Sequence, residues 1–258
     1  LCGAEAGRYE TTPPPGACRC VAIAYTTLHL HTCPTPTRCC VPAVQVDAFV
    51  ATASSCSRII VSERTVPNAS KSIQPVDVGG VAGGEKFISH GIFFKVITAE
   101  ARALYGGEDA AMKAAGHELK GSRAFLSVGV GTHPRASAAA SDLADAPLQL
   151  RTPLMALIDY GGCRLVACSL LPVSGSTLKY GSADAGRTVH RDAAIASAMA
   201  AAGRVLNLKP HLVGPPSAPV EVVGPCDIEV HAGRDGRFYV RMGQPTWQAS
   251  PSRVDAGP

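Results

Sequence analysis

The sequence has few aromatic and few charged residues, at 5% and 17% of its 258 residues. With so few rings to fill it, a hydrophobic core must rest mainly on Ala, Val, Leu and Ile. Hydrophobic residues still make up 46% of the chain, which is the composition of a globular protein, and the length fits one large domain or two small ones. A formal net charge of +4 permits contact with nucleic acid or an acidic surface but argues for neither.

Long apolar runs are absent as well. None approaches the roughly 18 residues of a membrane-spanning helix, so we expect no membrane span. The apolar segment Cys20–Leu30 lacks the basic cluster and the cleavage site of a signal peptide. We therefore expect a soluble chain that is not secreted. Because it begins with Leu1 rather than Met, we also expect a fragment or a processed product.

Cysteines are scarce outside the first part of the chain. Seven of the ten precede residue 57, and the other three are Cys163, Cys168 and Cys226. These three lie in apolar, strand-like contexts, where a thiol behaves as a small hydrophobe. The pattern excludes a disulfide scaffold for most of the chain and indicates a reducing compartment.

Residues 1–90 show weak periodicity and several Pro and Gly clusters. We expect a region of low order there, with short strand-like pieces at Val44–Val50 and Arg58–Ser62. Its early Cys and His residues are zinc-donor types, although Cys-x-Cys and Cys-Cys differ from the spacing of zinc knuckles. A zinc site and unstructured sequence both stay open for these donors: Cys18, Cys20, His29, His31, Cys33, Cys39 and Cys40.

Regular patterns begin at Gly91. The β-branched and aromatic run Ile92–Thr98 predicts a strand. Glu108–Lys120 predicts a helix, with acidic residues at its start and Gly121 after its end. The Ser/Ala-rich stretch Ser122–Leu150 is then expected to be a long loop.

Two hairpins enclose a second helix. Gly161-Gly162 supplies the tight turn of the first hairpin, and Asp192 is a good N-cap for a helix with Ile195, Met199, Ala202 and Leu206 on one face. The hairpin strands are Leu154–Tyr160 with Cys163–Pro172, and Cys226–His231 with Arg237–Met242 around the turn Gly233–Gly236. This order predicts an α+β fold with an antiparallel-rich sheet and two packed helices. The expected domain is residues 91–242, followed by a disordered tail at residues 243–258.

One candidate site is the glycine-containing segment Tyr180–His190. Backbone N–H groups near Gly181 and Ser182, together with Arg187, could hold a phosphate. In the alternative interpretation the segment is a structural turn in which Ser182 and Asp184 cap backbone amides. The segment is not a P-loop, because no Gly-Lys-Ser/Thr follows.

A second candidate is Asp227-x-Glu229-x-His231, whose side chains leave one face of a strand. Two carboxylates and an imidazole could hold a divalent metal or act as acid and base. The favoured alternative is the solvent-facing side of a hairpin strand. Nucleophile elbows, paired zinc-motif histidines and a Cys/His pair with catalytic spacing are all missing from the sequence, so we expect no enzyme, no metal and no cofactor.

Taken in order, the central segments resemble the CLU domain of the clustered mitochondria family, over about residues 91–240. The residues that carry the resemblance are Tyr105–Gly107, Ala114–Lys120, Leu154–Tyr160, Gly162, Arg164, Ser169–Pro172, Tyr180–Ser182, Asp184, Gly186, Thr188–His190, Leu208–His211, Asp227–Glu229, Gly233 and Asp235–Tyr239. Among them we single out the motif residues Asp159, Tyr160, Asp184, His190, Asp227, Glu229 and Asp235. Relative to the family, Ser122–Leu150 resembles an insertion and the pattern is lost after Tyr239, which is typical of a fragment or a divergent short member.

The resemblance implies a cytoplasmic, non-enzymatic protein linked to mitochondrial distribution and to the binding of mRNAs for mitochondrial proteins. It also implies a connection with translation, so that mRNA or ribosome-associated proteins are the expected partners. If RNA binds, we expect Arg187, Arg164, Lys179 and Lys209 to contact phosphates near Gly181 and Ser182. The alternative is a nucleotide-dependent enzyme, or a degenerate relative of one, with phosphates at Gly181–Gly186 and Mg²⁺ on Asp227 and Glu229.

Overall fold

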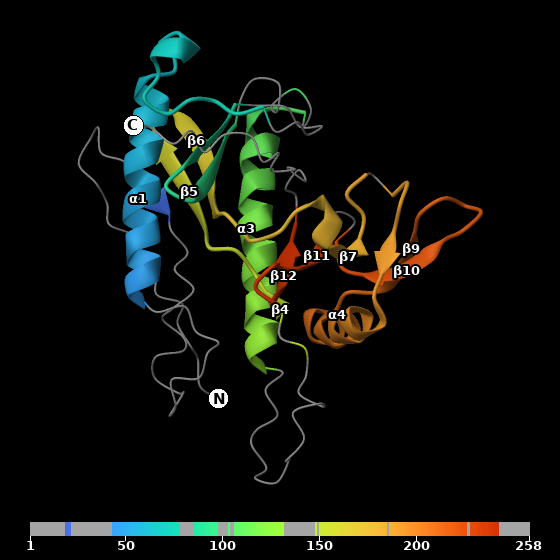
Figure 1. Cartoon of the computed structure of the whole chain (residues 1–258). Coiled ribbons are helices and arrows are strands. Elements are labelled where there is room, and N and C mark those ends of the chain that lie inside the picture. Colours follow the sequence, from blue (N-terminus) through green and yellow to red (C-terminus); the bar gives the residue numbers. More distant parts are fainter. Residues whose placement is uncertain are drawn as a thin grey trace, which may run out of the picture. The chain divides into compact units, whose positions relative to one another are not determined.

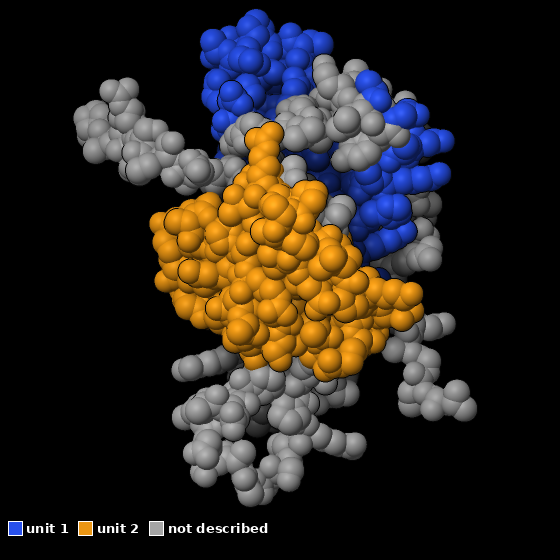
Figure 2. Space-filling model, turned by 90° about the vertical axis from the view of Figure 1, so that its right-hand side faces the viewer, with its two compact units in different colours: residues 1–77, 82–124, 152–171 blue, residues 78–81, 125–151, 172–258 orange. Residues whose placement is uncertain are grey.

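The computed structural model places the chain in two compact units, coloured separately in Figure 2. Unit 1 comprises residues 1–77, 82–124 and 152–171, and unit 2 comprises residues 78–81, 125–151 and 172–258. The structure describes residues 19–21, 43–77, 85–97, 103, 106–131, 148, 150–184, 186–225 and 228–242. The helices in these segments include none that is long and apolar enough to span a membrane.

Unit 1 is built on a five-stranded antiparallel sheet in the order β1-β5-β6-β3-β2. Its strands are β1 (Arg19–Val21), β2 (Lys86–Ser89), β3 (Ile92–Val96), β5 (Met155–Tyr160) and β6 (Cys163–Ser169). The β5–β6 hairpin closes at Gly161-Gly162, whose φ angles of 54° and 74° lie in the left-handed region that favours glycine. The predicted hairpin and its turn are therefore confirmed.

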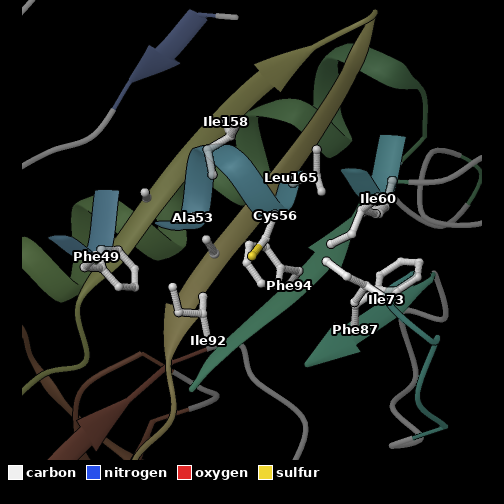
Figure 3. Close-up of a cluster of buried hydrophobic side chains, with 13 residues drawn as sticks. Phe49, Ala53, Cys56, Ile60, Ile73, Phe87, Ile92, Phe94, Ile158 and Leu165 are labelled. Atoms are coloured by element: carbon white, nitrogen blue, oxygen red, sulfur yellow. The ribbon is translucent and has the colours of Figure 1, made fainter. Parts of the chain in front are cut away.

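Helix α1 (Ala43–Ser62) corrects the prediction for this part of the chain, where short strand-like pieces were expected. The β-branched residues near both of its ends favour strands locally. Buried apolar side chains recur along it at spacings of three and four residues, which places them on one helical face. They are Val46, Phe49, Ala53, Cys56 and Ile60. All but Val46 belong to the cluster that packs on the sheet against Phe94, Ile158 and Leu165 (Figure 3).

Helix α3 (Glu108–Gly131) covers the opposite face of the same sheet, so that α1 and α3 enclose β5 and β6 (Figure 1). Strand β3 shows the alternation, because Phe94 belongs to the α1 side whereas Lys95 Nζ lies 3.8 Å from Glu118 Oε1 on α3. The sequence predicted that this helix ends before Gly121 and that a loop begins at Ser122, but the helix continues to Gly131. In the continued part, Ser122 is buried and donates to Met155 Sδ at 3.1 Å.

Unit 2 contains a second five-stranded sheet, in the order β4-β12-β11-β7-β8, with β4 parallel to β12 and the other pairs antiparallel. The strands are β4 (Leu150–Arg151), β7 (Leu178–Gly181), β8 (His190–Arg191), β11 (Glu229–Ala232) and β12 (Phe238–Arg241). A separate hairpin pairs β9 (Pro210–Val213) with β10 (Val220–Val223). The two predicted hairpins, β5–β6 in unit 1 and β11–β12 in unit 2, are thus present. Cys226 and Asp227, at the start of the second predicted hairpin, lie outside the described residues.

Helix α4 (Ala193–Leu206) provides the main apolar cover of unit 2. The Asp192 carboxylate accepts a hydrogen bond from the Ile195 backbone N–H at 3.1 Å, which confirms the predicted N-cap. Ile195, Met199 and Ala202 are buried against Tyr180, Val230 and Val240.

The α+β, antiparallel-rich fold predicted from the sequence is confirmed, with α1 as a third long helix. The proposed domain borders at residues 90 and 242 stay predictions. Most of residues 1–42, the middle of the predicted loop and the tail at residues 243–258 lie outside the described part of the chain.

Candidate functional site

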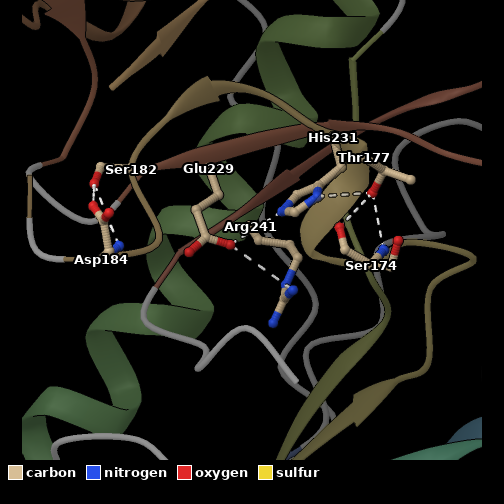
Figure 4. Close-up of polar contacts among 7 residues, drawn as sticks. All are labelled: Ser174, Thr177, Ser182, Asp184, Glu229, His231 and Arg241. Atoms are coloured by element: carbon tan, nitrogen blue, oxygen red, sulfur yellow. Dashed lines mark hydrogen bonds and ion pairs between the residues drawn. The ribbon is translucent and has the colours of Figure 1, made fainter. Parts of the chain in front are cut away.

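The turn between β7 and β8 is closed by the side chains of Ser182 and Asp184 (Figure 4). Ser182 Oγ donates to Asp184 Oδ1 at 2.8 Å and accepts from the Gly186 backbone N–H at 2.9 Å. Asp184 Oδ1 also accepts from the Thr188 backbone N–H at 2.8 Å. The hydrogen bonds from Thr188 and Ser182 lower the pKa of the Asp184 carboxyl below its ordinary value. These contacts are those of the structural interpretation, in which Ser182 and Asp184 cap backbone amides.

Gly181 has a separate reason to be glycine. Its φ of +91° is left-handed, and a Cβ added there would lie 1.9 Å from the carbonyl oxygen of Ile228. Gly181 also pairs in register with Glu229 on β11. β7 and β11 can therefore approach this closely only because residue 181 is a glycine and has no side chain.

Four basic residues were predicted to contact phosphate, and one of them belongs to a different unit from the other three. Lys179, Arg187 and Lys209 are exposed in unit 2. Arg164 belongs to unit 1, where its guanidinium donates to both carboxylate oxygens of Asp159 at 2.7 and 2.6 Å. The same guanidinium donates to the Met112 carbonyl oxygen of α3 at 3.3 Å. The Asp159 hydrogen bonds raise the pKa of Arg164.

The second candidate keeps only part of its predicted set, because Asp227 lies outside the described residues. Glu229 and His231 do leave the same face of β11, and His231 Nε2 lies 3.1 Å from Glu229 Oε2. Their side chains are 7% and 0% exposed. The expectation of a solvent-facing strand is therefore wrong for these two residues, because both side chains are buried.

Sequence reasoning missed the partners of this buried pair. Arg241 Nη1 lies 3.8 Å from Glu229 Oε2, and Thr177 Oγ1 lies 3.0 Å from His231 Nδ1. Figure 4 shows these side chains converging from β11, β12 and the short helix η3 (Gly175–Thr177). The register around the predicted hairpin turn pairs Glu229 with Arg241, so this contact could have been found. No sequence signal links Thr177 to His231.

The remaining motif residues have structural partners or lie at the surface. Asp235 accepts from Tyr239 Oη at 2.7 Å and from the Arg237 backbone N–H at 3.2 Å, and these hydrogen bonds lower its pKa. His190 is exposed on β8, and Tyr160 is half-buried at the end of β5.

Metal chemistry finds no support in the described segments, where no group of three or more His, Cys, Asp or Glu side chains is placed to hold an ion. The side chains of the predicted zinc donors near the N-terminus lie outside that part of the chain. One contact absent from the sequence reasoning is Cys56 Sγ to His90 Nδ1 at 3.7 Å. Cys56 is only 4% exposed and packs in the core of unit 1, so we interpret its contact with His90 as part of the packing of this core.

Comparisons with a family model and with curated proteins point to the same family. The family model described as CLU, clustered mitochondria, matches residues 43–241. A clustered mitochondria protein homolog from Anopheles gambiae and the protein clueless from Drosophila ananassae are each 28% identical over 178 residues. These matches cover 66% of this chain but only 11% of either relative. No solved structure matches.

Proposed function

Because the chain belongs to the clustered mitochondria family, we propose that it is a cytoplasmic, non-enzymatic binding module with a role in mitochondrial distribution. Its proposed ligand is mRNA that encodes mitochondrial proteins, with translation-associated proteins as further partners. The chain spans about a tenth of the length of the two relatives, at 11%. The role of those long proteins is therefore carried over to this chain as part of the proposal.

The observation that carries the RNA proposal is the exposure of three cationic side chains in unit 2. Lys179, Arg187 and Lys209 are all exposed: Lys179 lies on β7, Arg187 in the turn between β7 and β8, and Lys209 directly before β9. Cations on a rigid scaffold neutralise phosphates without reading bases, which suits a ligand bound with little sequence preference.

The turn at Ser182–Asp184 constrains how such a ligand would bind. The backbone N–H groups of Gly186 and Thr188 already donate to Ser182 and Asp184. A phosphate near this turn would therefore be held by the Arg187 side chain rather than by a nest of amides. Arg164 is excluded from the proposed contact set, because its guanidinium is paired with Asp159 in unit 1.

The alternative of a nucleotide- and Mg²⁺-dependent enzyme is less well supported. It requires Glu229 as a metal ligand, yet this side chain is buried and contacts His231 and Arg241. A buried carboxylate that already contacts an arginine and a histidine gains little from replacing these contacts with a hydrated Mg²⁺.

The test uses the full chain and fluorescent single-stranded poly(U), with binding measured at a series of salt concentrations. Three phosphate contacts predict a slope of about −2 in a plot of log affinity against log salt. The Arg187→Ala substitution should weaken binding and make the slope shallower by about 0.7. Arg58→Ala is the matched control, since Arg58 is an exposed arginine of α1 in unit 1 and its loss changes the net charge equally.

Crosslinking of the same proteins to cytosolic RNA then checks the ligand class. Crosslinks that decrease with salt and with Arg187→Ala, but persist in Arg58→Ala, support the proposal. A folded chain that binds no poly(U) at low salt and forms no crosslinks would exclude RNA as the ligand. The remaining proposal would then be a protein-docking module.

A further inference from the structure

The imidazole of His231 is enclosed in unit 2 with a partner at each ring nitrogen. Its side chain is 0% exposed. Nδ1 lies 3.0 Å from Thr177 Oγ1, and Nε2 lies 3.1 Å from Glu229 Oε2. Because the ring is buried, water cannot replace a partner that fails to match a ring nitrogen as donor or acceptor. The positions of the ring protons therefore follow from the hydrogen-bonding roles of the two partners.

Thr177 determines the role of Nδ1. The threonine hydroxyl has one proton, and Oγ1 donates it to the Ser174 carbonyl oxygen at 2.7 Å. The same Oγ1 accepts from the Ser174 backbone N–H at 2.9 Å. With its only proton in use, Oγ1 can meet His231 only as an acceptor. Nδ1 must therefore carry a proton and donate it.

Glu229 determines the role of Nε2. A contact of 3.1 Å between Nε2 and Oε2 requires a proton between the two atoms. Arg241 Nη1 lies 3.8 Å from the same Oε2, which favours the ionised carboxylate. A carboxylate has no proton to give, so Nε2 must donate as well. A neutral imidazole has only one N–H.

We infer that His231 is held as an imidazolium inside unit 2, in a buried row of charges that runs Arg241, Glu229, His231. The Glu229 carboxylate lies between two cations, which is the arrangement that makes buried charges tolerable. From β12, Tyr239 also pairs with His231 in register, and its hydroxyl donates to Asp235. The neighbouring strand β7 pairs Leu178 with His231 and Gly181 with Glu229. Of the titratable residues on β7, Lys179 is exposed, and Tyr180 pairs with Val230 and donates to the Val223 carbonyl oxygen.

The second ring proton, on Nε2, connects His231 to Glu229 in this arrangement. With it, the ring joins the η3 turn at Thr177 to Glu229 on β11 and, through the carboxylate, to Arg241 on β12. Without it, the lone pairs of Nε2 and Oε2 would face each other in the interior. Loss of this buried proton would therefore break the contact between His231 and Glu229, while the contacts of Nδ1 with Thr177 and of Arg241 with Glu229 would remain.

The test is nitrogen-detected NMR on the full chain with ¹⁵N-labelled histidine, which resolves the protonation of each ring among the 8 histidines. His231 is assigned through bonds to its backbone signals. The expected result near neutral pH is two N–H groups on the His231 ring, both exchanging slowly with water because the ring is buried. A ring with a single N–H at either nitrogen would overturn the inference.

The Glu229→Gln substitution gives a second, independent readout. The introduced amide can donate to Nε2, so the ring no longer needs its second proton, and we expect loss of the Nε2–H signal with Nδ1–H retained. Glu221→Gln on β10 is the matched control, because Glu221 is exposed in the same unit. This control should leave both His231 N–H signals in place. Retention of both protons after Glu229→Gln would contradict the role assigned to Glu229, and the wild-type spectrum decides the inference even if this variant does not fold.

Discussion

The Arg164 guanidinium donates hydrogen bonds to both carboxylate oxygens of Asp159 across the β5–β6 hairpin, at 2.7 and 2.6 Å. The two residues are direct cross-strand partners, so the hairpin register places them opposite each other. The same arginine reaches the Met112 carbonyl on α3. One side chain therefore ties the sheet of unit 1 to the helix that covers it, which is why Arg164 is left out of the proposed phosphate contacts.

Breaking this pair should destabilise unit 1. Asp159→Asn removes the charge from a half-buried, two-bond contact, with side-chain exposures of 30% and 25%. We expect a loss of about 1.5–3 kcal/mol in the free energy of unfolding, measured by urea denaturation. Glu85→Gln is the control, because it breaks a longer and more exposed ion pair with Arg64. That control should cost less than about 1 kcal/mol, and equal losses in the two variants would contradict the anchoring role.

Gly181 is predicted to be intolerant of any side chain. In Gly181→Ala the new Cβ would meet the Ile228 carbonyl oxygen, and the φ of +91° is strained for an L residue. The left-handed backbone costs about 1–2 kcal/mol and the overpacking a further 1–3 kcal/mol or so. Thermal denaturation of the full chain should show this loss.

The matched control for Gly181 is Gly116→Ala on α3. A Cβ at Gly116 has no atom within 4 Å, and the residue is helical. This substitution should stabilise the chain by roughly 0.5–1 kcal/mol, because alanine is the better helix former. A neutral Gly181→Ala variant would show that β7 and β11 do not approach as closely as described.

Acidification should open the Ser182–Asp184 turn. The pKa of Asp184 is lowered in the folded chain, chiefly by the hydrogen bond from Thr188. A depressed carboxyl pKa stabilises the turn above the pKa of an unfolded aspartate, and that contribution is lost as pH falls through the lower, folded value. The Thr188 amide signal in NMR should therefore titrate below the ordinary aspartate range. This transition should vanish in Asp184→Ala, and its survival there would assign it to another carboxyl group.

Nucleotide should not stabilise the chain. Glu229 is buried against His231 and Arg241 and offers no open position for Mg²⁺. We therefore expect no shift in melting temperature on addition of millimolar ATP with Mg²⁺ in a thermal shift assay. A Mg²⁺-dependent shift that disappears in Asp227→Asn would restore the enzyme alternative.

Much of the fold was readable from local patterns. The Gly161-Gly162 turn, the Asp192 cap and the spacing of Ile195, Met199 and Ala202 each depend on neighbours in the chain, and all three predictions are confirmed. Helix α1 was missed because β-branched residues near its ends favour strands locally. Its helical state follows from burial of Phe49, Ala53, Cys56 and Ile60 on a sheet whose strands lie far away in the sequence.

The sequence by itself determined the α+β class, the hairpins, the caps and the segments that resemble a known family. Only the tertiary structure decided which charged residues are buried, because the surroundings of a charge include segments that lie far away in the sequence. Arg164 and Glu229 belong to motifs that suggested phosphate or metal; in the fold Arg164 contacts Asp159, and Glu229 is buried against Arg241 and His231. The same packing seals His231 from water and so determines where its protons must lie.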